Sequence, residues 1–509
     1  MRWTRRTVAT GLALGATRML SPHAAQAQKP ADTLRIAWIG GVPTLDPYYN
    51  QQRVGLIVAH HAFDGLVHRD PVTFAIKPLL ASAWRAIDDT TIEFDLRQNV
   101  TFHDGSRFSA DDVVYTFNTI MTDPAVSVPS NYQWLSGTEK IDDYKIRLKL
   151  KRIFPAALEY LAMVMPIWPK ASRTALGATR YAMLPIGCGP YRITSITGQS
   201  EIELARFGDY YPESPKAKPS IARLSIRAYD TPEALSAAID QDRADWSWGV
   251  GQDEFARLSQ LPGWIGVQAE SMRVGYLSLD AAGRTGADNP LTKLKTRQAI
   301  FHAIDRSKIV KELIAGGARV ADAPCYPTQF GCDANAAVRY AYDPALAKAL
   351  LAEAGYPNGF ETDLVSYVLP SITTAVQTYL KAVGITVTMQ QLPISTAIAR
   401  SREGRSPLDM GSWGSYSIND VTAILPYFFT FTDADYVRDA ELKSLVEQGG
   451  ANTDVDARRK FYRAAVKLIT EKAYWLPLHT YATTYVYRRD LTFKPFPDEL
   501  PRFYLASWK

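Results

Sequence analysis

The chain of 509 residues is long enough for two or three domains. Its composition, with 47% hydrophobic and 21% charged residues, is typical of a globular protein and argues against a disordered one. Its formal charge of +5 is misleading, because residues 1–27 contain four arginines and no acidic residue. The remaining chain carries a formal charge of +1, which argues against a nucleic-acid partner.

The first 27 residues have the features of an export signal. A basic start precedes an apolar run at residues 8–16, and Ala25-Gln26-Ala27 fits a cleavage site. The run is shorter than the roughly 18 residues that cross a bilayer. Arg5-Arg6 indicates the twin-arginine route, and the general secretory (Sec) route stays open. No cysteine follows the cleavage site, so we expect a periplasmic protein without a lipid anchor.

The next segments alternate strand patterns with capped helices. Apolar and polar residues alternate at 33–38 and 91–96, as in half-buried strands, and Val100 and Phe102 continue the second alternation as a further short strand. Ser109 followed by Asp112 predicts a capping box that opens a helix. Asp-Asp pairs at 88–89 and 142–143 each precede an alternating run, which predicts two similar hairpins.

The C-terminal two thirds continue in the same mixed way. Thr231 and Pro232 predict the N-cap and first residue of a helix, and Gly355 and Gly384 predict positions just past helix ends. Further strands are expected at 201–207, 221–228 and 384–389, and helices at about 292–304, 306–315, 344–354, 370–382 and 456–471. The final residues, PRFYLASWK, are expected to pack back on the first domain. Periodicity alone indicates a mixed α/β fold.

A longer stretch carries a family resemblance. Residues 84–118, WRAIDDTTIEFDLRQNVTFHDGSRFSADDVVYTFN, resemble a signature of the extracellular solute-binding proteins of peptide, opine and nickel ABC importers, family 5. Five more landmarks follow the family's order, namely Thr44-Leu45-Asp46-Pro47, His61 to Val67, Gly187-Cys188-Gly189-Pro190-Tyr191, Arg297 to Arg306 and Tyr342 to Tyr356. The resemblance therefore covers nearly the whole chain after residue 27.

The resemblance implies a periplasmic-binding-protein-like α/β fold with two hinged lobes and an extra domain, the three-domain cluster C architecture. Domain I would comprise residues 28–63, 187–270 and 486–509, domain II residues 64–186, and domain III residues 271–485. The implied function is a monomeric receptor that captures a peptide or peptide-like solute between the lobes. It would deliver this solute to an inner-membrane ABC permease with cytoplasmic ATPases, without a cofactor and without doing chemistry.

Catalytic and metal-binding interpretations have little support in the sequence. There is no Gly-x-Ser-x-Gly elbow, Walker A loop, Gly-x-Gly-x-x-Gly turn or His-Glu-x-x-His helix. The histidines at 60, 61, 68 and 103 lack the spacing of metal ligands, so no metal is expected. An exported hydrolase that uses cleft carboxylates is the alternative from another class.

The cysteines predict one disulfide. Cys325 and Cys332 bracket a short loop that contains proline and glycine, and the exported location favours their oxidation. A zinc site would need two further ligands nearby, and the sequence offers none. Cys188 is then left over and is expected to be a buried small apolar residue.

The informative departure from the family lies at residues 410–420, MGSWGSYSIND. In peptide-binding relatives this loop carries an Asp that pairs with the ligand's α-ammonium group. Trp413 matches the family, but Tyr416 occupies that Asp position, and the loop's second acid falls on Asn419 or Asp420. Two ligands remain open: a peptide held mainly through its backbone, or a solute without a free α-amino group, such as an opine, a glycoside or a blocked peptide.

The expected ligand-binding residues follow from this loop and its surroundings. Aromatic faces can stack on a sugar or an apolar side chain, and arginines can bind a carboxylate. The stacking candidates include Trp246, and Arg53 and Arg273 are the candidates for a ligand carboxylate. The predicted site consists of Trp413, Gly414, Ser415, Tyr416, Asn419, Asp420, Tyr276, Trp248, Arg53 and Arg273.

Overall fold

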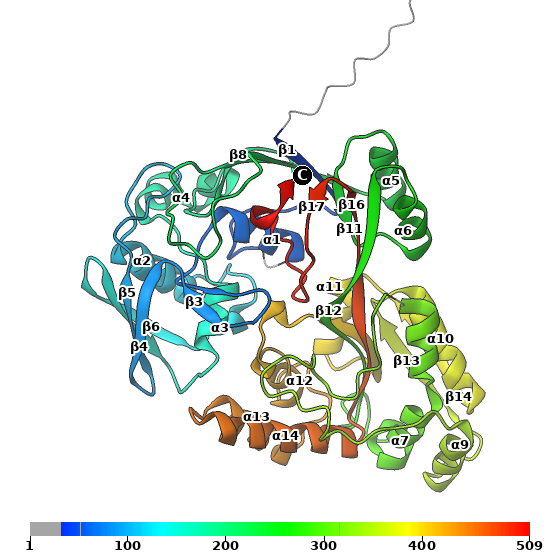
Figure 1. The fold of residues 1–509 in the computed structure, drawn as a ribbon. Coiled ribbons are helices and arrows are strands. Elements are labelled where there is room, and N and C mark those ends of the chain that lie inside the picture. Colours follow the sequence, from blue (N-terminus) through cyan, green and yellow to red (C-terminus); the bar gives the residue numbers. More distant parts are fainter. Residues whose placement is uncertain (1–31, 51, 315) are drawn as a thin grey trace, which may run out of the picture.

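The computed structural model describes residues 32–50, 52–314 and 316–509. The expected export signal at residues 1–27 lies outside the described residues. Strands and helices alternate along the described chain, as the α/β prediction requires. Figure 1 shows one body built around a small blue-to-cyan sheet and a second body that follows a much longer sheet.

The long sheet has ten strands in the order β14-β13-β15-β12-β16-β11-β1-β10-β9-β8. Its strands are β14 (Ile385–Gln391), β13 (Phe360–Ser366), β15 (Leu408–Trp413), β12 (Trp264–Leu279), β16 (Trp475–Arg488), β11 (Trp246–Trp248), β1 (Thr33–Ile39), β10 (Arg223–Tyr229), β9 (Glu201–Arg206) and β8 (Tyr191–Thr197). Segments from both ends of the chain therefore meet in one sheet. The strands expected at 33–38, 201–207, 221–228 and 384–389 are confirmed within two residues at each end.

Two long strands join the halves of this sheet. β12 and β16 pair antiparallel from Trp264 opposite Arg488 to Ser278 opposite Trp475, with register shifts between Ser271 and Val274 and after Gly275. In Figure 1 they run from the part that holds β1 to the part that holds β13. The expected domain boundaries at 270/271 and 485/486 fall inside these strands, and the division into three domains stays a prediction.

The smaller sheet consists of four antiparallel strands in the order β4 (Ala81–Asp88), β5 (Thr91–Leu96), β7 (Lys145–Leu150) and β6 (Leu135–Asp142). The pair β4-β5 turns at residues 88–91 and the pair β6-β7 turns at residues 142–145. The two predicted hairpins are thus confirmed, and their inner strands β5 and β7 pair with each other.

Helix α2 (Ala110–Thr122) begins at the predicted capping box. The Ser109 side chain accepts from the backbone, and the Ser109 N–H donates to Asp112 Oδ2 at 2.8 Å. Two of the helix's first N–H groups are satisfied in this way. The strand expected around Val100 and Phe102 is wrong, because this segment forms an isolated bridge between Thr101 and Arg107. Both side chains are nevertheless buried, which explains the alternation.

Most predicted helices of the second body are present. They are α5 (Pro232–Asp240), α7 (Leu294–Ala303), α9 (Pro344–Glu353), α10 (Pro370–Ala382) and α14 (Val455–Glu471), with Thr231 as the N-cap of α5. Gly355 and Gly384 have φ angles of +91° and +98°, as the helix-end prediction requires. The helix expected at 306–315 is only one turn, α8 (Arg306–Ile309), followed by a π-helical turn at Val310–Ile314.

The first body is connected to the long sheet through residues 61–66 and 187–191, here called the crossover. An ideal Cβ on Gly187 would lie 2.0 Å from the carbonyl oxygen of Ala62, and one on Gly189 would lie 2.5 Å from that of His61. Gly189 N–H donates to Ala62 O at 3.0 Å. Glycine is required here because the two backbone segments touch directly.

Buried charge in the crossover is paired within it or close to it. The Asp64 carboxylate lies 2.7 Å from Lys216 Nζ and accepts from the hydroxyls of Tyr210 and Tyr211 at 3.0 and 2.8 Å. A buried charge is tolerated when it is paired and hydrogen-bonded in this way. These contacts give Asp64, in the family landmark from His61 to Val67, a structural role.

The C-terminal segment packs against helix α1 (Arg53–Ala62) and β11, which belong to the predicted domain I. Phe503 N–H donates to His61 Nε2 at 2.9 Å, and its ring lies 4.9 Å from that of Trp246. Before this point the chain forms a loop at residues 497–502. In Figure 1 the red C-terminal segment reaches into the centre of the molecule, beside α1.

Candidate ligand-binding site

The loop after β15, residues 413–420, has an unusual backbone. Ser415, Tyr416 and Ser417 have φ angles of +49°, +49° and +64°, the left-handed region that non-glycine residues rarely adopt. The turn is closed by hydrogen bonds from Ser417 N to Gly414 O and from Ile418 N to Ser415 O, at 2.9 and 2.8 Å. Such strained residues cluster at binding sites, so the loop is a candidate on backbone grounds as well.

A cavity of about 520 Å³ lies between this loop and the first body. One wall comes from residues 413–450 and the other from residues 130–160. Six aromatic residues line it, three from each wall: Trp134, Phe154, Tyr160, Trp413, Tyr416 and Tyr427. Its volume is that of a small-molecule site.

The aromatic side chains of the cavity are fixed by contacts with one another. Trp413 stacks on Tyr427 with ring centroids 4.5 Å apart, and its indole N–H donates to Ala423 O at 2.8 Å. Tyr416 stands nearly perpendicular to Trp413 at 5.9 Å. On the opposite wall Trp134 and Phe154 stack at 5.1 Å. The cavity therefore presents preformed flat apolar faces, which suit a planar or apolar group of a ligand.

The charges around the cavity are mostly positive. Among the described residues that line it, Lys151 and Arg152 are exposed cations, and Glu447 supplies the one carboxylate. Glu447 already lies 2.5 Å from Lys443 Nζ. Burial raises the pKa of Tyr416 to about 12, so its hydroxyl is neutral at physiological pH. Tyr416 can hydrogen-bond or stack, but it cannot neutralise an ammonium group.

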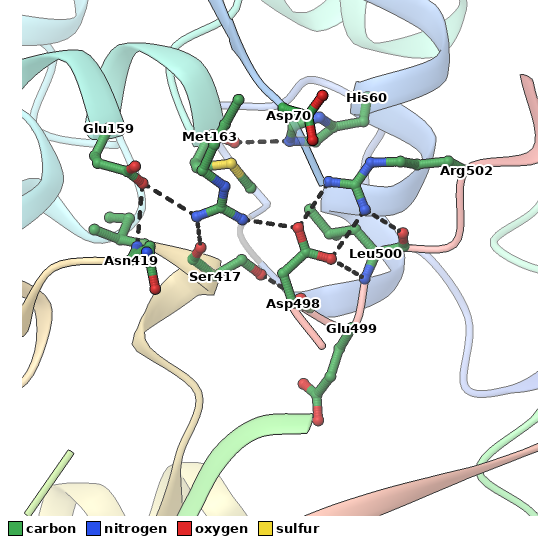
Figure 2. A network of polar contacts seen from close by, with 12 residues as sticks. His60, Asp70, Glu159, Met163, Ser417, Asn419, Asp498, Glu499, Leu500 and Arg502 are labelled. Atoms are coloured by element: carbon green, nitrogen blue, oxygen red, sulfur yellow. Dashed lines mark hydrogen bonds and ion pairs between the residues drawn. The ribbon is translucent and has the colours of Figure 1, made fainter. Parts of the chain in front are cut away.

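A buried ionic network lies behind the loop. The Glu159 carboxylate on α3 (Ala157–Met163) accepts from the backbone N–H of Asn419 and from Arg69, both at 3.1 Å. Arg69 also donates to Ser417 O and, at 2.7 Å, to Asp498. Figure 2 shows these contacts, with Glu159 and Asn419 on one side and Asp498 on the other. The network ties the first body, the loop and the C-terminal segment together.

The two arginines expected to bind a ligand carboxylate bind one from the chain itself. Arg53 Nη2 lies 3.1 Å and Arg273 Nη2 lies 2.9 Å from Glu499 Oε2. The hydroxyl of Ser417 accepts from Arg53 and donates to Asp498 O at 2.6 Å. The structure therefore brings Arg53 and Arg273 to the loop, as expected, together with a partner that sequence reasoning missed.

The remaining predicted residues lie at varying distances from the cavity. Asp420 is buried, pairs with Arg458 at 2.8 Å and caps the short helix that follows. Tyr276 stacks on Trp475 at 4.6 Å inside the core. Trp248 packs beside Trp246 at 6.1 Å in the core next to β16. Contact of these residues with a ligand stays a prediction.

Sequence reasoning missed one wall of the cavity and the C-terminal carboxylates. Trp134, Phe154 and Tyr160 lie more than 250 residues before the loop, and no local pattern relates them to it. Asp498 and Glu499 follow a run of proline and phenylalanine that has no regular periodicity. Their role depends on partners that are distant in the chain.

The loop is supported from outside by the segment that Cys325 and Cys332 close. The structure joins these cysteines in a disulfide, with Cα atoms 5.8 Å apart. Between them, Gln329 Nε2 donates to Ile418 O and Phe330 N–H donates to Asn419 O, both at 2.9 Å. Cys188 has a free thiol and is buried.

Neither a metal site nor a membrane-spanning helix is found in the part of the chain that the structure describes. Groups of three or more His, Cys, Asp or Glu side chains placed to hold a metal ion are absent from residues 32–50, 52–314 and 316–509. Across the same residues, the helices are too short or too polar to cross a bilayer. His60 and His61 instead bond to the backbone of Met163 and Ile57.

Comparisons with known proteins concern the fold and the family of this chain. The glutathione-binding protein GsiB of Shigella flexneri serotype 5b is 26% identical over 477 residues, which cover 89% of this chain and 90% of that protein. The periplasmic binding protein DppA from Helicobacter pylori, in complex with the peptide STSA, superposes with a TM-score of 0.80 at 22% identity, over 94% of this chain and 98% of that one. MoaA from A. tumefaciens R10, in complex with mannopinic acid, has a TM-score of 0.76 at 22% identity, over 94% and 99%.

A body built on a long mixed sheet and a smaller body built on its own four-stranded sheet, with an aromatic cavity between them, define the periplasmic-binding-protein fold, cluster C, and the predicted fold class is confirmed. The model of the bacterial extracellular solute-binding proteins, family 5 middle region, matches residues 75–435. The chain belongs to this family. It is a receptor for a solute and not an enzyme, as the sequence predicted.

Proposed function

We propose that this chain is the exported receptor of an ABC importer and that it captures a peptide or peptide-like small solute in the cavity between residues 130–160 and 413–450. The observation that carries this is the cavity itself, because its aromatic walls come from both bodies. A ligand held by both walls favours the closed arrangement, as in other hinged binding proteins. The receptor acts as a monomer and delivers the solute to an inner-membrane permease with cytoplasmic ATPases.

The relatives support this class of ligand. Proteins similar to this chain include a glutathione-binding protein, a dipeptide-binding protein in complex with Met-Leu and an ABC transporter-associated protein in complex with the peptide STSA. Residues 1–27 would direct export through the Sec or the twin-arginine route. Domains I, II and III would have the boundaries given above, with the cavity between domains II and III.

A ligand without a free α-amino group is the second candidate. It is favoured by Tyr416 in place of the family's Asp and by the single carboxylate, Glu447, among the described lining residues. An ammonium group brought into a cavity that holds Lys151 and Arg152 lacks the strong partner that such a charge requires. Structures similar to this chain include proteins in complex with mannopinic acid and agropinic acid.

Calorimetry separates the two candidates. The protein without residues 1–27 is titrated with a dipeptide, its N-acetylated form, glutathione and an opine. If the second candidate is right, acetylation leaves the affinity unchanged within about threefold; a free-amine preference above about tenfold favours the peptide with a free amino group. Failure of all four ligands to bind would contradict the proposed ligand class.

The variant Tyr416→Asp tests the position of the ligand. A carboxylate here should raise the affinity for the free-amine dipeptide about tenfold over the acetylated form, because a charge-assisted hydrogen bond is worth about 1.5–3 kcal/mol. The matched control is Tyr342→Asp, since Tyr342 is exposed and does not line the cavity. Equal behaviour of the two variants would place Tyr416 outside the binding site.

A further inference from the structure

Two arginine side chains meet behind the binding loop. Arg53 is the first residue of α1, and Arg273 lies where β12 shifts register. An ideal Cβ on Gly414 would lie 3.0 Å from Arg273 Nη2 and 3.2 Å from Arg53 Nη2. Both guanidinium groups therefore lie close to the backbone of the binding loop. Trp413 and Tyr416 of this loop line the cavity. Two cations this close repel each other unless an anion lies between them.

Glu499 supplies that anion. Its Oε1 accepts from Arg273 Nε at 3.2 Å, and its Oε2 lies 2.9 Å from Arg273 Nη2 and 3.1 Å from Arg53 Nη2. This is the two-pronged contact that arginine makes with a free carboxylate. The side chains of Arg53, Arg273 and Glu499 are 16%, 29% and 8% exposed, so the site reaches solvent on the Arg273 side.

The carboxylate is held there by the backbone of the C-terminal segment. Glu499 has a φ angle of +56°, a conformation that costs free energy for a residue with a side chain. The preceding Asp498 is fixed by Arg69 and Arg502, each at 2.7 Å, and Pro497 O accepts from Met272 N–H at 2.6 Å. The loop thus directs one side chain into the space between two arginines. In Figure 2 Glu499 points away from the Asp498 network, toward β12.

We propose that Glu499 determines specificity: its carboxylate occupies an anion site formed by Arg53 and Arg273 and so excludes a ligand carboxylate from this side of loop 413–420. Selection then rests on the aromatic walls of the cavity and not on a charged end of the ligand. A ligand acid group has to point away from the two arginines or be absent. This inference depends on the proposed position of the ligand beside the loop.

Removal of the carboxylate should turn the site into a receptor for free carboxylates. In Glu499→Ala the arginines lose their partner, and propionate should raise the Tm by about 1–2 °C at saturating concentration, because a ligand that binds the folded state stabilises it. Propionamide, which has the same shape without the charge, should have no effect. The wild type should respond to neither compound.

Two controls make this measurement specific. Glu353→Ala removes an exposed carboxylate that pairs with Lys295, far from the binding loop, and should show no response to propionate. Glu499→Ala combined with Arg273→Ala should lose the response. Equal responses to propionate and propionamide in Glu499→Ala, or an equal response of the wild type, would overturn the proposal.

A second experiment uses the wild type and does not depend on the folding of a variant. A dipeptide and its C-terminal amide should bind with affinities within about threefold of each other, since the arginines are already occupied; a preference above about tenfold for the free acid would overturn the proposal. If neither peptide binds, the proposed ligand class fails, and the propionate measurement alone decides the role of Glu499.

Discussion

The crossover and the binding loop both bury charge, but their partners differ. In the crossover, residues 61–66 and 187–191 touch through their backbones, and Asp64 is paired with Lys216 beneath them. In the binding loop, the partners Glu159, Arg53 and Asp498 come from three distant parts of the chain. The crossover contacts build the fold, whereas the loop contacts join the first body, the binding loop and the C-terminal segment. Changes in the first should therefore unfold the protein, and changes in the second should alter what it binds.

The largest effect is expected from Gly187→Ala. The new Cβ would lie 2.0 Å from the backbone oxygen of Ala62 and 2.8 Å from the ring of Phe63, which leaves no room for it. We expect a loss of about 4 kcal/mol or more in the free energy of unfolding, measured by urea denaturation. Gly208→Ala is the matched control, because no atom lies within 4 Å of its Cβ position, and it should change stability by less than about 0.5 kcal/mol. Similar values for the two variants would contradict the assigned role of the crossover.

The second-largest expected effect is a loss of stability at acidic pH, caused by protonation of Glu499. Burial raises the pKa of Glu499, but the Arg273 and Arg53 guanidiniums outweigh it and bring this pKa from 4.5 to about 2. A carboxylate with a lowered folded-state pKa contributes stability above its unfolded pKa and loses it as the pH falls toward the folded value. Between pH 4.5 and pH 2 the wild type should lose about 3 kcal/mol from this group.

Glu499→Gln should lack this part of the pH dependence. Asp498, whose pKa is also low because Arg502 and Arg69 outweigh the effect of burial, keeps these partners in both proteins, so its contribution to the pH dependence should be the same in both. The measurement is urea denaturation at several pH values below 5. Parallel profiles for the wild type and the variant would show that Glu499 is not paired as described.

Local patterns were sufficient to predict the strands and the capped helix of the first body, but they did not predict the acidic partners behind the binding loop. The alternation at 91–96 and the capping box at Ser109 act between residues a few positions apart, so a single sequence displays them. The ion pair between Arg273 and Glu499 joins residues 226 positions apart, and the bond from Arg53 to Asp498 O spans 445. Arg53 and Arg273 were predicted, but charged residues are usual on a surface, so nothing in the sequence distinguished their partners Asp498 and Glu499. The family resemblance supplied the loop but not its partners.

Reduction of the disulfide should affect the loop more than the crossover. The ring closed by Cys325 and Cys332 supports Ile418 and Asn419 through Gln329 and Phe330. The variant with serine at both positions should lose about 2–3 kcal/mol of stability, because the disulfide no longer restricts the unfolded chain. Ligand affinity should also fall, although the far-ultraviolet circular dichroism of this variant should be unchanged. An unaltered affinity would mean that the loop holds its shape without this support.

The smallest effect is expected from Glu159→Gln. Its carboxylate joins α3 to the loop through Asn419 N–H, and the neutral amide keeps the shape but weakens the charge-assisted bonds to this group and to Arg69. We expect an affinity loss of about five- to tenfold, equivalent to about 1 kcal/mol, with little change in Tm. Small-angle scattering of the ligand-free protein should show a more open average shape. Glu353→Gln, at an exposed ion pair, is the control.

The paired strands β12 and β16 give the molecule a mechanical property. They form a paired ribbon between the halves of the long sheet, and the pairing shifts register between Ser271 and Val274 and again after Gly275. A bulge bends a strand and increases its twist, so we expect the ribbon to bend at this point. Arg273 is located at that point, and Arg53 is anchored on α1. Flexing of the ribbon would therefore change the separation of the two guanidinium groups. The shape of the whole receptor would in this way be coupled to the ion pairs of Arg53 and Arg273 with Glu499.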